Sequence, residues 1–179
     1  KRASAVALPP GQLARVLVVM TVASATAGLL FNLTTNGNGQ FLAERLGGIV
    51  NDPATLGLLL AAVYAVSSLS QVVVGRLLDR VPLKRLQLAV VLLQAPLLAA
   101  ASVAQGWWLY AALVGVMVLI FGAIPFTDAV IVRYVDDHMR SRVAGLRLTL
   151  SLGFSSLAVW SLGPVVKAGG FGTLFMVMA

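Results

Sequence analysis

Long apolar runs constrain the fold of this 179-residue chain more than any other feature. Five of them lie at residues 13–33, 57–75, 86–104, 107–132 and 146–166, and a sixth occupies residues 171–179. A helix needs about 20 mainly apolar residues to cross the hydrocarbon layer of a bilayer. Because a chain in lipid must satisfy its own backbone hydrogen bonds, we expect each of the first five runs to be a transmembrane helix and the sixth to be the start of another.

The composition agrees with a membrane protein. Hydrophobic residues make up 59% of the chain and charged residues 11%, whereas a soluble domain is about half apolar and a quarter charged. The chain has no cysteine, and no metal site or catalytic triad can be built around its one histidine, His138. We therefore expect no metal and no cofactor, and we predict that residues 1–179 form a single all-α transmembrane helical bundle.

The basic residues gather at alternate ends of the runs. Eleven of the 13 lie before or at the start of the first run, between the second and third runs, or between the fourth run and the start of the fifth: Lys1, Arg2, Arg15, Arg76, Arg80, Lys84, Arg85, Arg133, Arg140, Arg142 and Arg147. Only Arg45 and Lys167 fall on the other side. Cytoplasmic loops are enriched in Lys and Arg, so the N-terminus and these two loops are expected in the cytoplasm. This placement explains the net charge of +7 without nucleic-acid binding.

A charged stretch between the second and third runs carries a motif. It reads Gly75-Arg-Leu-Leu-Asp79-Arg80-Val-Pro-Leu-Lys84. This pattern resembles the signature loop of the major facilitator superfamily of secondary transporters. The family commonly has glycine at the position of Pro82 and a basic residue at that of Leu83. The stretch 135–145 and the Gly-Pro pair at 163–164 are also similar to this family.

The resemblance implies one six-helix half, with five full spans and the start of a sixth, of a twelve-helix transporter. The degenerate signature and the basic N-terminal stretch indicate the C-terminal half, so a partner N-terminal half is expected. The family transports small solutes by alternating access, often coupled to protons, as symport or antiport. The resemblance further implies the lipid bilayer of a bacterial inner membrane as the location.

The resemblance also implies a gating role for the signature loop. In the family, the aspartate of this loop caps a helix of the opposite half. A carboxylate near a helix N-terminus is stabilising, so a contact made in only one conformation would bias the gate. The gating candidates are Gly75, Asp79, Arg80 and Lys84. The alternative is a solvated loop charge that only sets topology.

Asp128 is the one acidic residue inside an apolar run. It precedes Arg133 by five residues, which places it about 7–8 Å into the membrane. Intramembrane acids usually face a cavity or a partner. Asp128 is therefore either a protonatable coupling site or the partner of Arg133, Arg140 or another cytoplasmic arginine. The shallow depth favours the ion pair.

Amide and hydroxyl side chains cluster between residues 32 and 40, where Gly37 and Gly39 weaken a helix. We predict a helix interrupted near 36–39 and resumed to about 46, because broken helices in transporters present polar groups to substrate. The alternative is an ordinary outer loop. In the second run, Tyr64 and Gln71 are seven residues apart and share one helix face. The substrate-pathway candidates are Asn32, Thr35, Asn36, Gln40, Tyr64 and Gln71.

Other functions fit the sequence less well. A nucleotide-binding Gly-x-x-x-x-Gly-Lys loop is absent, so direct use of ATP is not supported. An intramembrane enzyme would need a nucleophile with a base, or two acids, at membrane depth, and the runs hold no histidine and only Asp128. We therefore expect no enzyme. A non-transporting multi-pass membrane scaffold or channel subunit remains the alternative to a transporter.

Overall fold

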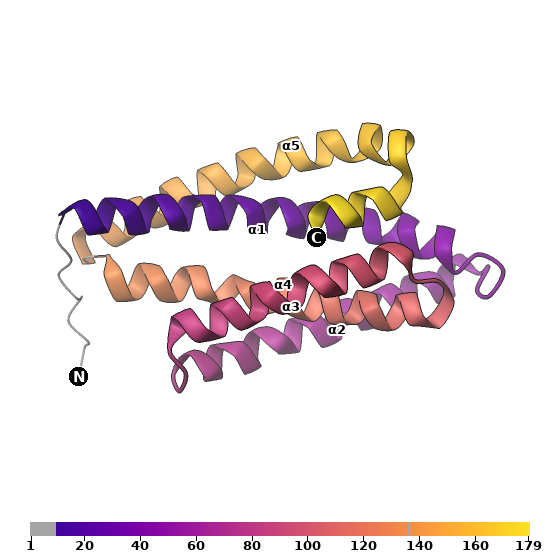
Figure 1. Ribbon diagram of the computed structural model, residues 1–179, viewed down its shortest axis with the longest axis horizontal. Coiled ribbons are helices and arrows are strands. Elements are labelled where there is room, and N and C mark those ends of the chain that lie inside the picture. Colours follow the sequence, from indigo (N-terminus) through magenta and orange to yellow (C-terminus); the bar gives the residue numbers. More distant parts are fainter. Residues whose placement is uncertain (1–9, 136) are drawn as a thin grey trace.

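The computed structural model describes residues 10–135 and 137–179, and within them the chain forms helices joined by short turns (Figure 1). The helices are α1 (Pro10–Arg45), α2 (Pro53–Leu78), α3 (Leu83–Val103), α4 (Gly106–Tyr134) and α5 (Asp137–Met178). No strand occurs in these residues, so the predicted all-helical fold is confirmed.

A kink divides α5 into a first segment, residues 137–169, and a last segment, residues 171–178. Gly170 adopts φ 72° and ψ 173°, a left-handed φ that glycine tolerates without strain. The last segment consequently turns back along the bundle (Figure 1). This kink falls between the fifth and sixth predicted runs.

Several helices are long and apolar enough to cross a membrane. Among the described residues, four stretches meet this criterion: Pro53–Leu78, Leu83–Val103, Gly106–Phe126 and His138–Met178. They coincide with the second to fifth predicted runs and support a multi-pass integral membrane protein. Helix α1 has 36 residues and would measure about 54 Å. Several side chains in its first half lie outside the description, so the span at 13–33 stays a prediction.

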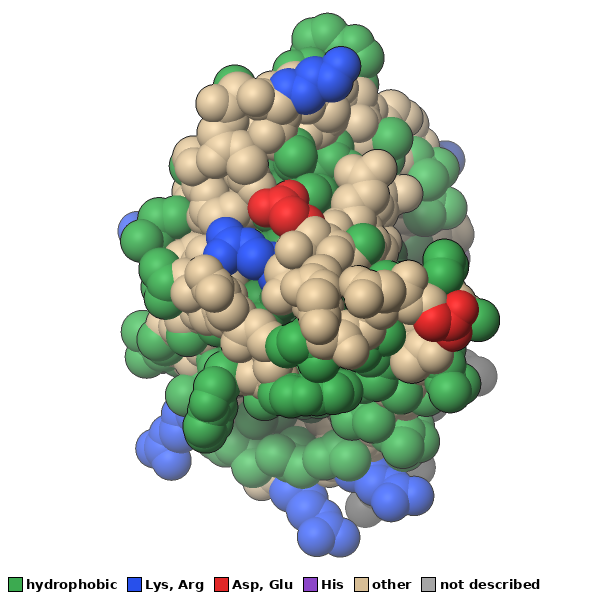
Figure 2. All heavy atoms as spheres, turned by 90° about the vertical axis from the view of Figure 1, so that its right-hand side faces the viewer, with side chains coloured by type: hydrophobic (Ala, Val, Ile, Leu, Met, Phe, Trp, Pro, Cys, Tyr) green, Lys and Arg blue, Asp and Glu red, His purple; other side chains and the backbone are tan. Residues whose placement is uncertain are grey.

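The helices run back and forth between two ends of the bundle (Figure 1). One end holds the start of α1, the α2–α3 turn and the α4–α5 junction, and we call it the basic end. The opposite end holds the α1–α2 loop, the α3–α4 turn and Gly170. Seen from the opposite end, hydrophobic side chains cover much of the visible surface and few charged side chains face the viewer (Figure 2).

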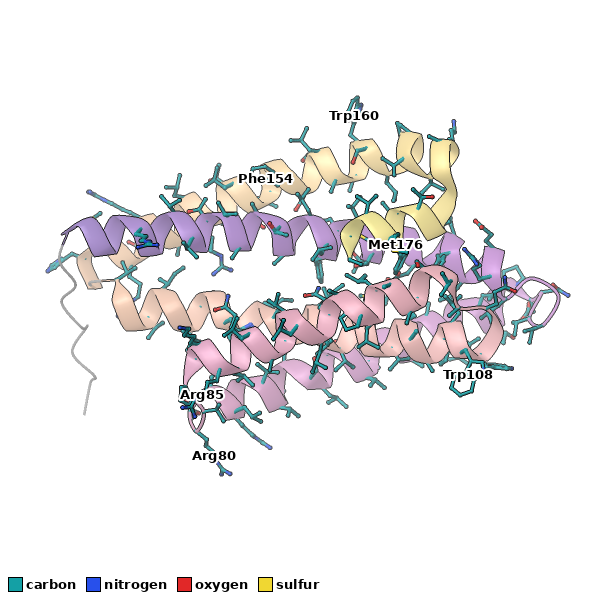
Figure 3. All side chains as sticks on the ribbon, in the orientation of Figure 1. Arg80, Arg85, Trp108, Phe154, Trp160 and Met176 are labelled. Carbon is teal, nitrogen blue, oxygen red and sulfur yellow. The ribbon has the colours of Figure 1, made fainter. Side chains whose placement is uncertain are left out.

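The charged and aromatic side chains follow this division. The basic end carries Arg15, Arg76, Arg80, Lys84, Arg85, Arg140, Arg142 and Arg147, and the opposite end carries Arg45 and Lys167. At the opposite end, the Trp108 side chain is 82% exposed and points away from the bundle (Figure 3). This is the position that tryptophan favours at a membrane interface.

The α1–α2 loop is shorter than the sequence suggested, because α1 does not break. Residues 36–39 continue the helix to Arg45, and no described residue between 10 and 45 has a positive φ. The Asn36 amide donates to the Asn32 carbonyl at 2.8 Å, which follows the helix instead of interrupting it. The predicted interruption and the alternative of an outer loop are therefore both wrong. The connecting segment covers only residues 46–52.

Gly37 remains in the helix because it serves packing. A Cβ atom added there would lie 3.2 Å from the Phe171 ring. Small residues at such a point let two membrane helices approach closely. The glycines that the sequence presented as helix breakers therefore need not end the helix.

The helices pack in a pattern that repeats after three segments. Helix α1 packs on the first segment of α5, as α4 packs on α2. Helix α3 packs on α4, as the last segment of α5 packs on α1. The α1–α2–α3 unit starts at the basic end, whereas the α4–α5 unit starts at the opposite end (Figure 1). Exchanging the two units therefore reproduces the same packing pattern, and the two units run in opposite directions.

The apolar core lies in the half of the bundle nearer the opposite end. Its most buried side chains include Phe41 of α1, Leu113 of α4 and Phe175 of α5. The Phe41 and Phe175 rings stack with centroids 4.4 Å apart. Tight packing at this end fixes the position of α1 against α4 and α5.

Candidate functional site

A polar and aromatic cluster lies where α1, α2 and α4 meet. It comprises Asn38 and the Thr35 carbonyl from α1, Tyr64 from α2, and Met117 and Phe121 from α4, and we call it the Asn38 cluster. The Asn38 amide nitrogen donates to the Tyr64 hydroxyl at 3.4 Å and to the Met117 sulfur at 3.3 Å. The Tyr64 hydroxyl donates to the Thr35 carbonyl at 3.0 Å. One chain of hydrogen bonds thus connects the three helices.

The amide oxygen of Asn38 is the unusual atom of this cluster. Asn38 is fully buried, and its Oδ1 has no hydrogen-bond partner among the described residues. Leaving a buried polar atom unpaired costs about 1–3 kcal/mol. Such an acceptor is chemically suited to a donor group of a small molecule or of water.

Aromatic rings border the Asn38 cluster. The Phe121 ring stacks against Tyr64 with centroids 6.1 Å apart and is tilted against Phe31 at 5.3 Å. All three side chains are only partly buried. The region therefore combines an unpaired acceptor with an apolar ring surface, the mixture that small-molecule sites favour.

The unbroken course of α1 explains how these residues come together. In a continuous helix, Phe31, Thr35 and Asn38 recur at intervals of four and three residues and share one face. On α2, Ser67 and Ser70 are buried with their hydroxyls bonded to backbone carbonyls. The Ser70 hydroxyl also donates to the Val118 carbonyl of α4 at 2.9 Å. These small residues hold α2 close to α4 and so position Tyr64.

The predicted substrate-pathway residues divide into four groups. Thr35 and Tyr64 belong to the Asn38 cluster. The Asn32 amide instead faces α5, where it donates to the Ser155 hydroxyl at 2.7 Å. Asn36 and Gln40 lie on the exposed side of α1.

Gln71 lies two turns from Tyr64 on α2 and is partly buried. It makes no side-chain hydrogen bond with another described residue. The structure therefore brings together only two of the six predicted residues.

Sequence reasoning missed Asn38, Met117 and Phe121 as members of one site. Asn38 lies inside the polar stretch at 32–40, where the sequence predicts an interrupted helix, and an interrupted helix gives it no defined face. A continuous helical pattern would have grouped it with Phe31 and Thr35. Met117 and Phe121 carry no such signal, because both lie in an uninterrupted apolar run.

The gating candidates lie in and beside the α2–α3 turn. Asp79 is the C-cap residue of α2, and its backbone N–H bonds to the Leu77 carbonyl. The side chains of Asp79, Arg80 and Lys84 are exposed, and no ion pair joins Asp79 to Arg80 in the described residues. Gly75 has open space around it, since an added Cβ would meet nothing within 4 Å.

Asp128 forms an ion pair with Arg147, the two charged groups lying 2.5 Å apart. The side chains are 67% and 29% exposed, respectively, and the pair joins α4 to the first segment of α5. The predicted partner Arg133 has a side chain outside the described set. Arg140 donates instead to the Val132 carbonyl at 3.0 Å, near the end of α4.

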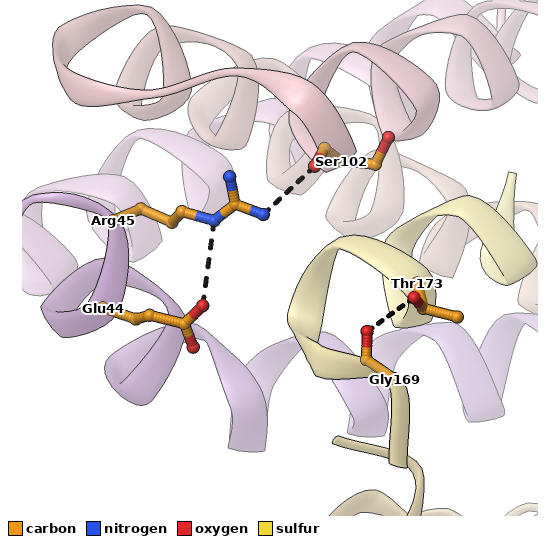
Figure 4. A network of polar contacts seen from close by, with 5 residues as sticks. All are labelled: Glu44, Arg45, Ser102, Gly169 and Thr173. Atoms are coloured by element: carbon orange, nitrogen blue, oxygen red, sulfur yellow. Dashed lines mark hydrogen bonds and ion pairs between the residues drawn. The ribbon is translucent and has the colours of Figure 1, made fainter. Parts of the chain in front are cut away.

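Arg45 holds the opposite end of the bundle together (Figure 4). Its guanidinium donates to the Ser102 carbonyl at 3.3 Å, in the last turn of α3, where helix carbonyls lack intrahelical partners. The same guanidinium lies 5.8 Å from the centre of the Phe41 ring. Arg45 thus links α1 to α3, close to the start of the last segment of α5.

Comparisons of the chain with protein-family models, curated proteins and solved structures gave no match. Among the side chains that the structure describes, no three His, Cys, Asp or Glu residues are grouped to hold a metal ion.

Proposed function

We propose that the chain acts in secondary active transport of a small solute by alternating access, in the manner of the major facilitator superfamily. The main support for this proposal is the arrangement of two three-segment units. They run in opposite directions and pack against each other through equivalent contacts. Inverted repeats of this kind occur within each six-helix half of such transporters, with substrate bound near the repeat interface. Here α1 and α4 meet at that interface through Phe31 and Phe121.

The Asn38 cluster supplies groups that suit a substrate site in this proposal. Its position on α1, α2 and α4 lies along the boundary between the two units. The unpaired Asn38 oxygen would accept a hydrogen bond from the solute, and the rings of Tyr64 and Phe121 would contact its apolar part. A solute with one donor group beside an apolar or aromatic portion fits these groups best.

Proton coupling is part of the proposal, but Asp128 is a poor candidate for it. Its carboxylate is already paired with Arg147 of α5. We assign the pair to holding α4 against α5. With the basic end facing the cytoplasm of a bacterial inner membrane, the pair lies near the cytoplasmic surface.

A flux experiment tests the proposal. The protein expressed from its gene is reconstituted in liposomes, and uptake of a panel of radiolabelled small solutes is measured with and without an imposed pH gradient. We expect saturable uptake of at least one solute that depends on the gradient. A protein that is folded but gives no saturable flux with any solute would instead support the scaffold or channel-subunit alternative.

Two substitutions refine this test. Asn38→Leu should lower the flux at least about fivefold, because one lost hydrogen bond to a buried acceptor is worth about 1–3 kcal/mol. Asn36→Leu, on the exposed side of α1, is the matched control and should leave the flux within twofold. Asp128→Asn should preserve proton-driven flux. Loss of proton-driven flux in an Asp128→Asn variant that still folds would instead indicate that Asp128 couples protons to transport.

A further inference from the structure

An apolar groove on the bundle is lined by residues of α2, α3 and α4. It has a volume of about 340 Å³, and its lining includes Val66, Leu69, Val73, Val90, Val118 and Gly122. The one polar lining side chain, Ser70, has its hydroxyl bonded to the Val118 carbonyl at 2.9 Å. The groove therefore offers an apolar surface without a free side-chain donor.

On the α2 side of the groove, the apolar residues are followed by basic residues toward the basic end. Val66, Leu69 and Val73 are 48%, 66% and 54% exposed. They recur at helical intervals of three and four residues, and the same interval continues to Arg76 in the last turn of α2. One exposed stripe of α2 thus begins with apolar side chains and ends with the Arg76 guanidinium at the basic end, and Arg80 follows in the adjoining turn.

The α2–α3 turn adds to this charge. Four basic residues, Arg76, Arg80, Lys84 and Arg85, stand against the single acid Asp79 between positions 76 and 85. Figure 3 shows the Arg80 and Arg85 side chains projecting away from the bundle at this turn. The turn therefore presents a positive field at the end of the groove.

The length of the groove matches one leaflet of a bilayer. From Val66 to Val74 the helix rises about 12 Å, and one leaflet contributes about 15 Å of hydrocarbon. With the arginines at the membrane surface, the apolar stripe would lie at acyl-chain depth. An apolar stripe of this length that ends beside positive charge matches the acyl chain and the negative headgroup of an anionic lipid.

We propose that this groove binds a phospholipid with a net negative headgroup. One acyl chain lies along the stripe from Val66 to Val73, and the phosphate contacts Arg76 and Arg80. Each basic residue near a membrane surface strengthens binding to anionic lipid by about fivefold. This site does not depend on the proposed transport activity.

Lipid titration of the purified, delipidated protein in detergent tests the proposal. Phosphatidylglycerol and phosphatidylcholine with identical acyl chains are added, and bound lipid is counted by native mass spectrometry. We expect phosphatidylglycerol to bind at least tenfold more tightly. The double variant Arg76→Gln/Arg80→Gln should lower its affinity about 25-fold and that of phosphatidylcholine much less, because the choline cation offsets the charge of its phosphate. The matched control is Arg15→Gln/Arg142→Gln, which removes two exposed charges from α1 and α5 at the same end.

A second pair of variants tests the groove itself. Val73→Trp should fill the groove and weaken both lipids at least tenfold. Val91→Trp, on α3 outside the groove and with a similar exposed fraction of 55%, should change neither. Unchanged helicity by circular dichroism establishes that each variant folds. Equal effects of the two tryptophans, or of the two charge doublets, would show general attraction of lipid to the surface and overturn the proposal.

Discussion

At Asn38 the chain buries an amide whose nitrogen is bonded and whose oxygen has no partner among the described residues. Asn38→Leu removes the unpaired oxygen, keeps the number and branching of side-chain heavy atoms, and leaves Tyr64 bonded to the Thr35 carbonyl. We expect the free energy of unfolding to change by less than about 1 kcal/mol, because replacing a poorly paired buried polar group by an apolar one is nearly neutral. Thermal unfolding in detergent measures this change.

Asn38→Asp is the informative contrast. An isolated carboxylate at a fully buried site must be desolvated or protonated, so we expect a loss of about 3 kcal/mol or more. Asn51→Asp, in the α1–α2 loop, serves as control, since Asn51 is exposed and surface changes usually fall within about 0.5 kcal/mol. Equal destabilisation at both positions would contradict the burial of Asn38.

Asp52 links stability to pH at the N-terminus of α2. Its carboxylate accepts hydrogen bonds from the Thr55 hydroxyl at 2.7 Å and the Thr55 backbone N–H at 2.9 Å. These bonds lower the pKa of Asp52 below its ordinary value of 3.8. A lowered pKa in the folded state means that the stabilisation is present above pH 3.8 and is lost as the pH falls through the folded-state value.

We therefore expect the melting temperature of the wild type to exceed that of Asp52→Ala at pH 6, and the difference to shrink below pH 3.8. Asp52→Asn keeps a good capping side chain without a titrating group. Its advantage over alanine should stay constant with pH. A difference between wild type and Asp52→Ala that is equally large at pH 2 and pH 6 would contradict the capping role of the carboxylate.

At the scale of helices, apolar runs identify the elements but not their ends. The second and fourth runs, 57–75 and 107–132, lie inside the longer helices α2 and α4. The extra turns carry charged or polar residues, such as Arg76 in the last turn of α2, which hydropathy excludes although the backbone stays helical. Capping at Asp52 and Pro53 sets the true start of α2.

The predicted break in α1 failed for a different reason. Local propensity made Gly37 and Gly39 weak points, but the packing of α1 against α5 compensates for that weakness. The two contacts that decide this, Gly37 against Phe171 and Gly28 against Ser151, join residues more than 100 positions apart. No local pattern in the sequence contains that information, which is also why the Asn38 cluster was only half predicted.

The same contacts predict the effect of filling the space at Gly37. A larger side chain there would meet Phe171 at 3.2 Å and Leu162 at 3.6 Å. We expect Gly37→Leu to lower the free energy of unfolding by about 1–3 kcal/mol, the usual cost of overpacking. Gly153→Leu is the matched control, because nothing lies within 4 Å of a Cβ added at Gly153. Chemical unfolding followed by circular dichroism compares the two, and equal effects would contradict the α1–α5 contact.

In the whole molecule, successive turns lie alternately at the basic end and the opposite end, and this holds only if every membrane-crossing helix has been counted. One missed crossing would place the α2–α3 turn and the α3–α4 turn at the same end. The structure places them at opposite ends of α3, with Leu83 at its start and Gln105 just beyond its last residue. A helix of 21 residues separates them, which corresponds to about 32 Å and matches the hydrocarbon thickness of a bilayer.

Thiol labelling of the protein in sealed membrane vesicles tests this arrangement directly, because the chain has no native cysteine. Leu83→Cys and Gln105→Cys are made separately and exposed to a membrane-impermeant maleimide, before and after the vesicles are permeabilised. We expect one variant to label in intact vesicles and the other only after permeabilisation. Asp52→Cys, in the α1–α2 loop, should behave like Gln105→Cys. Labelling of Leu83→Cys and Gln105→Cys from the same side would contradict the crossing of α3 and, with it, both the transporter proposal and the leaflet assignment of the lipid groove.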